Sequence, residues 1–190
     1  MESALLAGIE VRTKILSVHA VIRRAVLTTM NNVISSADVH KYAMEHLGSV
    51  FETMLAIKAV PMAEPDLSQF SEGHVSGTVG FAGKTVVGSV YLHVTASFAC
   101  QATAAMLGLA PEEISGTAEI NDVIGEVTNM LAGGLKSWLC DAGTPCALTT
   151  PAVIRGTSYS VAANPDVERI QIGFDCGRSR GLAEIHIKFN

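Results

Sequence analysis

The most regular stretch of the sequence is INDVIGEVTNMLAGGLKSWL, residues 120–139. At about 3.6 residues per helical turn, its large apolar residues fall within about 80° of arc: Ile120, Ile124, Val127, Leu131, Leu135 and Trp138. The residues on the opposite side of such a helix are Asp122, Glu126, Asn129, Gly133 and Lys136, called here the polar ridge. The pattern predicts a long amphipathic helix with one face in a core and the polar ridge toward solvent.

The polar ridge contains residues that do not favour a helix. Asn129 lies in mid-helix, where Lys, Glu or Ala would be better by a few tenths of a kcal/mol. Gly133 and Gly134 follow one turn later and cost up to about 1 kcal/mol each relative to Ala. An exposed polar face is ordinary for an amphipathic helix, so a purely structural explanation stays open. The loss of local stability around Asn129 nevertheless favours a contact surface.

Two helices are predicted in the first sixty residues. Apolar residues recur at helical spacing over residues 5–34. A second helix is predicted from N-cap candidates at Ser35, Ser36 and Asp38 to about Ala59. Its expected inward residues are Met44, Leu47, Phe51, Met54 and Leu55. Pro61 ends it, and residues 61–71 predict a long loop or an edge strand.

Strand patterns occupy the middle and the end of the chain. Residues 74–94 alternate with a period of two around a turn at Gly83-Lys84, which predicts a β-hairpin. A short helix is predicted over residues 96–109, and residues 112–140 contain the long helix. Three strands are predicted within residues 151–159, 168–174 and 182–189. The expected fold class is α+β, with long helices packed on an antiparallel or mixed sheet of five or six strands.

Length and composition limit the possible classes of protein. The chain has 190 residues, enough for one compact domain with a substantial core. Hydrophobic residues make up 48% and charged residues 16%, which excludes a disordered chain. The basic residues are scattered and number 13 against 18 acidic ones, for a net charge of −5. This balance argues against nucleic acid or an anionic membrane as the main partner.

The mean hydropathy of +0.35 requires a check for membrane segments. The uncharged stretch at residues 89–111 contains His93, Gln101 and several hydroxyl residues, so it lacks the ~20 continuous apolar residues of a spanning helix. Charged residues interrupt any signal-like segment near the amino terminus: Glu2, Glu10, Arg12 and Lys14. We therefore expect a cytoplasmic protein with no membrane partner.

Cysteine and histidine spacing predicts neither a disulfide framework nor a metal site. The cysteines, Cys100, Cys140, Cys146 and Cys176, lie far apart with no CxxC pair. The histidines are likewise dispersed and form no HExxH motif. Buried free thiols and no bound metal are the expectation.

The polar ridge carries the motif of a known family. Asp122, Glu126 and Asn129, followed by Pro151, fit the pattern Asp/Ser-x3-Glu-x2-Asn…Pro of the CheC/CheX/FliY family of chemotaxis phosphatases. Other segments resemble its CheX branch: GEVTNMLAGGLKS (125–137), TTPAVIRG (149–156), VSGTVGFAG (75–83) and GSVYLHV (88–94). The resemblance covers about residues 39–190. It implies a CheX-like layered domain over residues 37–190. Residues 1–36 lie outside the resemblance, and their helical spacing predicts an amino-terminal helical extension.

The resemblance implies removal of the phosphoryl group from a phosphorylated CheY-type receiver. An aspartyl phosphate is already reactive, and the receiver supplies its own Mg²⁺ and Lys, so the visiting protein has only to position a water in line with phosphorus. No cofactor of the chain's own is expected. Asn129 can accept a hydrogen bond from that water and donate to phosphoryl oxygens. Glu126, on the same side of the helix, would pair with the receiver's Lys.

The other ridge residues are expected to bind the partner. Asp122, Gly133 and Lys136 are candidates, although Asp122 has a second explanation in the helix dipole, which favours acidic residues near the start of a helix. Pro151 is expected to shape the entry into the following strand rather than to act in catalysis. A second copy of the motif is missing from the earlier helix, where Ser49 stands in place of Glu126. The resemblance also implies a homodimer joined through edge strands.

Two other classes of function compete with a phosphatase. A non-catalytic adaptor could keep the ridge for binding a receiver or another signalling protein without hydrolysing it, and residues 1–36 are consistent with such a role. A metabolic enzyme with an internal pocket finds no support, because the sequence shows no nucleophile–base pair, phosphate loop or metal set. A receiver phosphatase with Glu126 and Asn129 as the working pair is the favoured hypothesis.

Overall fold

The computed structural model describes residues 34–62, 73–157, 161–162, 164–177 and 179–190. The helix predicted over residues 5–34, and most of the extension expected at residues 1–36, lie outside the described residues. Residues from Ser35 to Asn190 form one compact unit.

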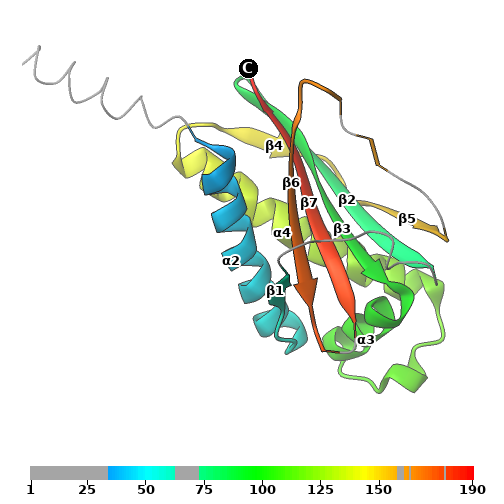
Figure 1. Ribbon diagram of the computed structural model, residues 1–190. Helices are drawn as coiled ribbons and strands as arrows, with labels where there is room; N and C mark the ends of the chain where they lie inside the picture. Colours follow the sequence, from blue (N-terminus) through cyan, green and yellow to red (C-terminus); the bar gives the residue numbers. More distant parts are fainter. Residues whose placement is uncertain (1–33, 63–72, 158–160, 163, 178) are drawn as a thin grey trace, which may run out of the picture. The chain divides into compact units, whose positions relative to one another are not determined.

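A single antiparallel sheet forms the frame of the molecule (Figure 1). Its strands are β1 (Val60–Met62), β2 (His74–Gly83), β3 (Val86–Thr95), β4 (Cys146–Leu148), β5 (Ala152–Gly156), β6 (Glu168–Asp175) and β7 (Arg180–Phe189). The order is β1-β6-β7-β3-β2-β4, and β5 pairs with β2 beside β4. The sheet therefore has seven strands, where five or six were predicted. Strand β1 lies at the edge of the sheet and overlaps residues 61–71, where a long loop or an edge strand was predicted. Strand β4 was not predicted, because its three residues are too few to show a period of two.

The predicted hairpin is confirmed as β2 and β3. Their register runs from His74 opposite Thr95 to Ala82 opposite Val87, so the turn falls at Lys84 and Thr85. Every second residue of β2 is buried toward the helices: Val75, Gly77, Val79 and Phe81. The next strand in the sheet, β7, pairs with β3 over its whole length.

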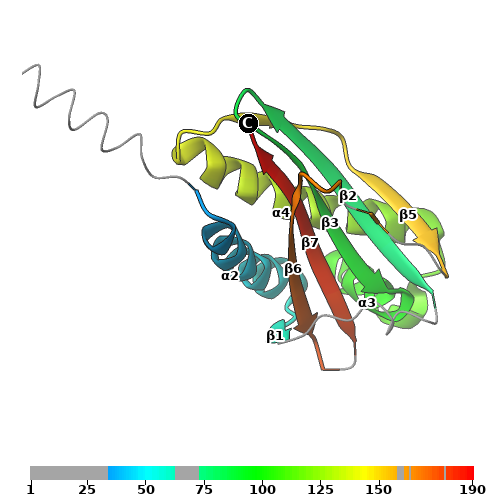
Figure 2. The same cartoon turned by 45° about the horizontal axis from the view of Figure 1, so that its top comes forward.

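Three α-helices pack on one face of this sheet (Figure 2). They are α2 (Ser36–Leu55), α3 (Ala96–Leu107) and α4 (Thr117–Asp141), with a short 3₁₀ turn, η2 (Pro111–Glu113), before α4. A cluster of aromatic rings joins the layers, because Phe51 of α2 packs on Phe98 of α3 and on Phe174 of β6. The expected α+β class with helices layered on an antiparallel sheet is confirmed.

Residues at its two ends determine where helix α2 begins and stops. Ser35 is its N-cap, and it forms a capping box with Asp38: the Ser35 hydroxyl accepts from the Asp38 amide and the Asp38 carboxylate accepts from the Ser35 amide. These hydrogen bonds from Ser35 lower the pKa of Asp38. The helix ends at Leu55, because Ala56 adopts the left-handed conformation at φ 52°. The prediction that the helix reaches Ala59 was wrong, and Met54 is 39% exposed rather than inward.

Helix α4 lies very close to the sheet at one point. A Cβ atom on Gly77 of β2 would lie 2.0 Å from the Thr128 hydroxyl oxygen of α4, so a glycine is required there. Thr128 itself donates a hydrogen bond to the Ile124 carbonyl, at 2.7 Å, which satisfies its buried hydroxyl. This contact fixes the face of α4 that meets the sheet and so determines which face remains outside.

Candidate functional site

The polar ridge of α4 lies on the outer side of the helix. Asp122 and Glu126 are exposed, while Asn129, Gly133 and Lys136 are half-buried. The opposite side is packed into the core through Ile124, Val127, Leu131 and Leu135. The amphipathic pattern predicted for residues 120–139 is therefore confirmed. Trp138, at the edge of the apolar stripe, stacks on Tyr42 of α2 with ring centroids 5.0 Å apart.

The functional groups of the polar ridge are not engaged with the rest of the described chain. The carboxylates of Asp122 and Glu126 and the ammonium of Lys136 form no ion pair with any described residue. The Asn129 carboxamide and the Glu126 carboxylate likewise make no hydrogen bond within the described ranges. Glu126 and Asn129 are three positions apart on one helix, so their side chains lie on neighbouring parts of the same surface. A partner can reach both without displacing an internal bond.

The segment that enters β5 runs beside the ridge. A Cβ atom on Gly125 would lie 3.6 Å from Val153 and 3.8 Å from Pro151, so these two side chains pack next to Glu126 on its helix. Pro151 comes directly before β5, in keeping with the prediction that it shapes the entry into that strand. The motif residues of α4 and Pro151 therefore belong to segments that pack against each other.

Sequence reasoning missed the anchor at the start of α4. Arg155 of β5 donates from Nε to the side-chain oxygen of Asn121, at 2.6 Å, and from Nη2 to the Thr117 carbonyl, at 3.2 Å. These bonds tie the first turns of α4 to the strand beside it. No spacing rule could pair residues 34 and 38 positions apart, although an Arg on a short exposed strand was a visible candidate.

Asp122 is less well explained by the helix dipole than the sequence suggested. Helix α4 begins at Thr117, so Asp122 lies in its second turn, whereas the acidic residue of the first turn is Glu119. The dipole's effect on charges falls off beyond the first turn. The exposed Asp122 therefore keeps its place as a candidate for partner binding.

The two glycines of the ridge region have different surroundings. Nothing lies within 4 Å of a Cβ atom built on Gly133, so this position is open on the ridge. A Cβ atom on Gly134 would lie 2.0 Å from Nε2 of His46, because α2 packs over that position. The interpretation of both glycines as part of a contact surface was therefore wrong for Gly134, whose glycine serves helix packing. His46 was not singled out from the sequence.

Comparison with known proteins assigns the chain to a family. The family model described as Chemotaxis phosphatase CheX matches residues 75–175, which include α4 with its ridge and all of β5. This match spans more than half of the chain. The chain belongs to the CheX family. No protein of curated function matches the sequence.

Solved structures of CheX and CheC-like proteins share the fold. The chain is 26% identical to the chemotaxis protein CheX from Vibrio vulnificus, with a TM-score of 0.69 over 82% of this chain and 99% of that one. It is 29% identical to a CheC-like superfamily protein from Shewanella sp. PV-4, with a TM-score of 0.69 over 81% and 99% of the two chains. A CheX–CheY–BeF₃–Mg²⁺ complex from Borrelia burgdorferi is 22% identical with a TM-score of 0.66, over 82% of this chain and 99% of that chain, and it supports the fold alone.

The described residues form neither a metal site nor a membrane-spanning helix. No group of three or more His, Cys, Asp or Glu side chains in the described part of the chain is arranged to hold a metal ion. Cys100, Cys140, Cys146 and Cys176 are free thiols, and burial raises the pKa of Cys176 to about 11. None of the described helices combines the length and apolar composition needed to cross a bilayer.

Proposed function

We propose that this CheX-family protein removes the phosphoryl group from the aspartyl phosphate of a CheY-type receiver. The observation that carries the proposal is the pair Glu126 and Asn129, which project from one exposed side of α4 with no internal hydrogen bond in the described chain. Membership of the CheX family motivates the choice of partner, because a structure of the same fold from Borrelia burgdorferi holds CheX bound to CheY with BeF₃ and Mg²⁺.

The proposed reaction requires no covalent step on this protein. Water oxygen attacks phosphorus, the bond between phosphorus and the aspartyl oxygen breaks, and the products are an aspartate carboxylate and inorganic phosphate. The electron pair of the broken bond stays on the carboxylate, which is a good leaving group. The receiver brings the Mg²⁺ that neutralises the phosphoryl charge, so this proposal needs no cofactor of the chain's own.

Asn129 supplies the positioning in this mechanism. Its carboxamide oxygen accepts a hydrogen bond from the attacking water, and its N–H groups donate to phosphoryl oxygens. A carboxylate in the same place would bring negative charge next to the phosphoryl group. Holding the water in line with the P–O bond turns a bimolecular step into one within a complex, which is the largest effect available here.

Glu126 and its neighbours supply the docking. Glu126 would pair with the Lys of the receiver's active site and fix the angle at which α4 approaches. Asp122 and Lys136 add charge of both signs along the ridge, and the open position at Gly133 lets the receiver surface come close to the α4 backbone. The proposal places the protein in the cytoplasm with its receiver, as a homodimer joined through edge strands.

The experiment that tests the proposal measures binding and hydrolysis together. A receiver of the same organism is charged with acetyl phosphate and Mg²⁺, and phosphate release is followed with and without this protein. Affinity is measured separately for the receiver activated with beryllofluoride, a stable mimic of the phosphoryl group. Accelerated release supports the phosphatase. Tight binding without acceleration would instead make the protein an adaptor.

A further inference from the structure

Two residues of α2 form hydrogen bonds to the backbone of α4 immediately behind the ridge. Nε2 of His46 lies 3.2 Å from the Met130 carbonyl oxygen, and since a carbonyl can only accept, Nε2 is the donor. The Tyr42 hydroxyl donates to the Gly134 carbonyl at 3.0 Å. Met130 directly follows Asn129 in the chain, and Gly134 lies one turn further on. The two bonds therefore hold the turn that carries Asn129.

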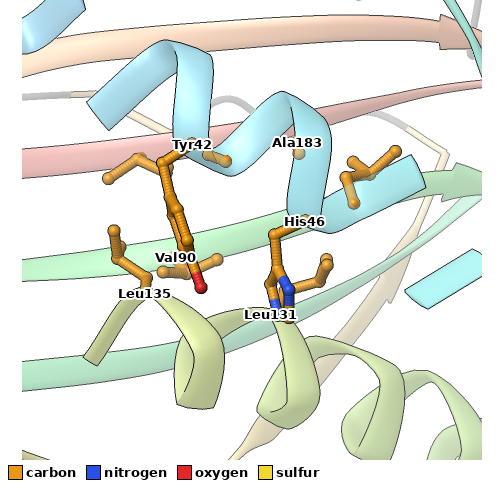
Figure 3. A pocket seen from close by; sticks show the side chains of 9 residues that line it. Tyr42, His46, Val90, Leu131, Leu135 and Ala183 are labelled. Atoms are coloured by element: carbon orange, nitrogen blue, oxygen red, sulfur yellow. The ribbon is translucent and has the colours of Figure 1, made fainter. Parts of the chain in front are cut away.

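Ring stacking and a close approach support these bonds. The Tyr42 ring lies between His46, with centroids 5.6 Å apart, and Trp138 of α4, with centroids 5.0 Å apart, and both pairs are nearly parallel. Figure 3 shows Tyr42 and His46 pointing from α2 toward α4, on the side of Leu131 and Leu135. His46 can occupy this position because Gly134 has no side chain.

The space enclosed by these residues is not a ligand site. It is an apolar cavity of about 20 Å³ between α2, α4, β3 and β7, with Leu47, Val90 and Ala183 among its other walls. A cavity of this size holds at most about one water molecule, and apolar walls offer it few partners. Its lining serves the contact between the two helices.

This contact lies at the weakest part of α4. Gly133 and Gly134 are adjacent, and each lowers helix stability by about 1 kcal/mol relative to Ala. In-line attack depends on placement to a fraction of an ångström, so a helix loosened next to Asn129 would lose rate before it lost binding. We propose that Tyr42 and His46 are positioning residues of the phosphatase reaction, which set the orientation of the Asn129 turn from the opposite side of α4. The inference rests on the proposed function.

The test removes the hydrogen bond made by Tyr42 or by His46 and keeps an aromatic ring at that position. Tyr42→Phe and His46→Phe are compared with wild type, with His46→Gln, which keeps a donor at the Nε2 position, and with Tyr91→Phe on the sheet as a matched control. The measurements are kcat and KM for the phosphorylated receiver, affinity for the beryllofluoride-activated receiver, the melting temperature, and amide hydrogen exchange over residues 129–135.

The two Phe variants at positions 42 and 46 should lower kcat by about tenfold, with KM and affinity within about twofold of wild type. Amide exchange over residues 129–135 should become faster in the same variants. His46→Gln and Tyr91→Phe should stay within about twofold of wild type in every measurement. This split between kcat and affinity is not expected of residues that only stabilise the fold.

Three outcomes would overturn the inference, and they can be told apart. Unchanged kcat in both Phe variants with an active wild type refutes the positioning role alone. An equal fall in kcat and in affinity, together with a lower melting temperature, reduces the two residues to structural ones. A wild-type protein that binds the receiver without hastening its dephosphorylation refutes the proposed function, and this inference with it.

Discussion

Asn129 is half-buried on the polar ridge, and its carboxamide is free of internal hydrogen bonds in the described chain. Replacing it with Ala removes the water-positioning group and raises helix propensity by a few tenths of a kcal/mol. Asn129→Ala should therefore lose at least about 100-fold in receiver dephosphorylation, while its melting temperature and receiver affinity stay near wild type. Unfolding of this variant would show that the residue carries a structural role instead.

Glu126 is proposed to bind the receiver rather than to position the water. Glu126→Gln keeps the shape of the side chain and removes its charge, so the pairing with a receiver Lys is lost. Because hydrogen bonds to charged groups contribute about 1.5–3 kcal/mol, affinity for the activated receiver should fall by roughly 10- to 100-fold, and kcat should fall as well. The affinity can be measured by titration at two salt concentrations. Unchanged affinity and rate would refute the pairing.

At the scale of secondary-structure elements, the two adjacent glycines of α4 make a matched pair. Gly134→Ala forces the His46 ring away from the Met130 carbonyl, and we expect it to lower the free energy of unfolding by about 1–3 kcal/mol. Gly133→Ala meets nothing within 4 Å and should raise the free energy of unfolding by up to about 1 kcal/mol. Urea denaturation measures both. Equal effects of the two changes would contradict the packing described here.

The elements differ in how well the sequence predicted them. Helix α4 and the hairpin of β2 and β3 were predicted, because each is long enough to show its period. Strand β1 overlaps the segment at residues 61–71 where a loop or an edge strand was predicted. Strand β4 was not predicted, because three residues carry no period, and the end of α2 depends on a single left-handed residue, Ala56. The ridge itself followed from periodicity. The hydrogen bonds from α2 that hold α4 behind the ridge did not, because His46 and Met130 are 84 positions apart and only the folded chain brings them together.

At the scale of the whole molecule, a buried polar network across β2, β3, β6 and β7 makes stability depend on pH. Nδ1 of His93 and the Ser76 hydroxyl share a hydrogen bond, with 2.6 Å between the atoms, and burial lowers the pKa of His93 to about 4. Nearby, the carboxylate of Glu184 is fully buried and bonded to both Arg169 and His186. The net effect of these hydrogen bonds, against the opposing effect of burial, is to lower the pKa of Glu184.

The lowered pKa values of His93 and Glu184 both make the folded state less stable as the pH falls. Because the folded pKa of His93 lies below its unfolded value near 6.5, its contribution to stability is complete above about pH 6.5 and is lost as the pH falls toward 4. Glu184 adds a further loss below its unfolded pKa, near 4.5. The free energy of unfolding should thus fall by about 3 kcal/mol between pH 6.5 and pH 4 from His93 alone.

Denaturant titrations across this pH range measure the effect. His93→Gln should flatten the dependence between pH 6.5 and pH 4, even though it lowers stability at neutral pH. His40→Gln, a change at an exposed histidine of α2, serves as the control and should leave the slope as it is in wild type. A slope that persists unchanged in His93→Gln would assign the acid sensitivity to other groups.

The central claim is that this CheX-family chain hydrolyses a receiver's aspartyl phosphate through Asn129. The most direct measurement is the decay of a phosphorylated receiver of the same organism in a single turnover, with wild-type protein, with Asn129→Ala and with neither. The account predicts fast decay with wild type and decay at the receiver's own rate with Asn129→Ala, although both proteins bind the activated receiver. Equal acceleration by the two proteins, or none by wild type despite binding, would contradict it.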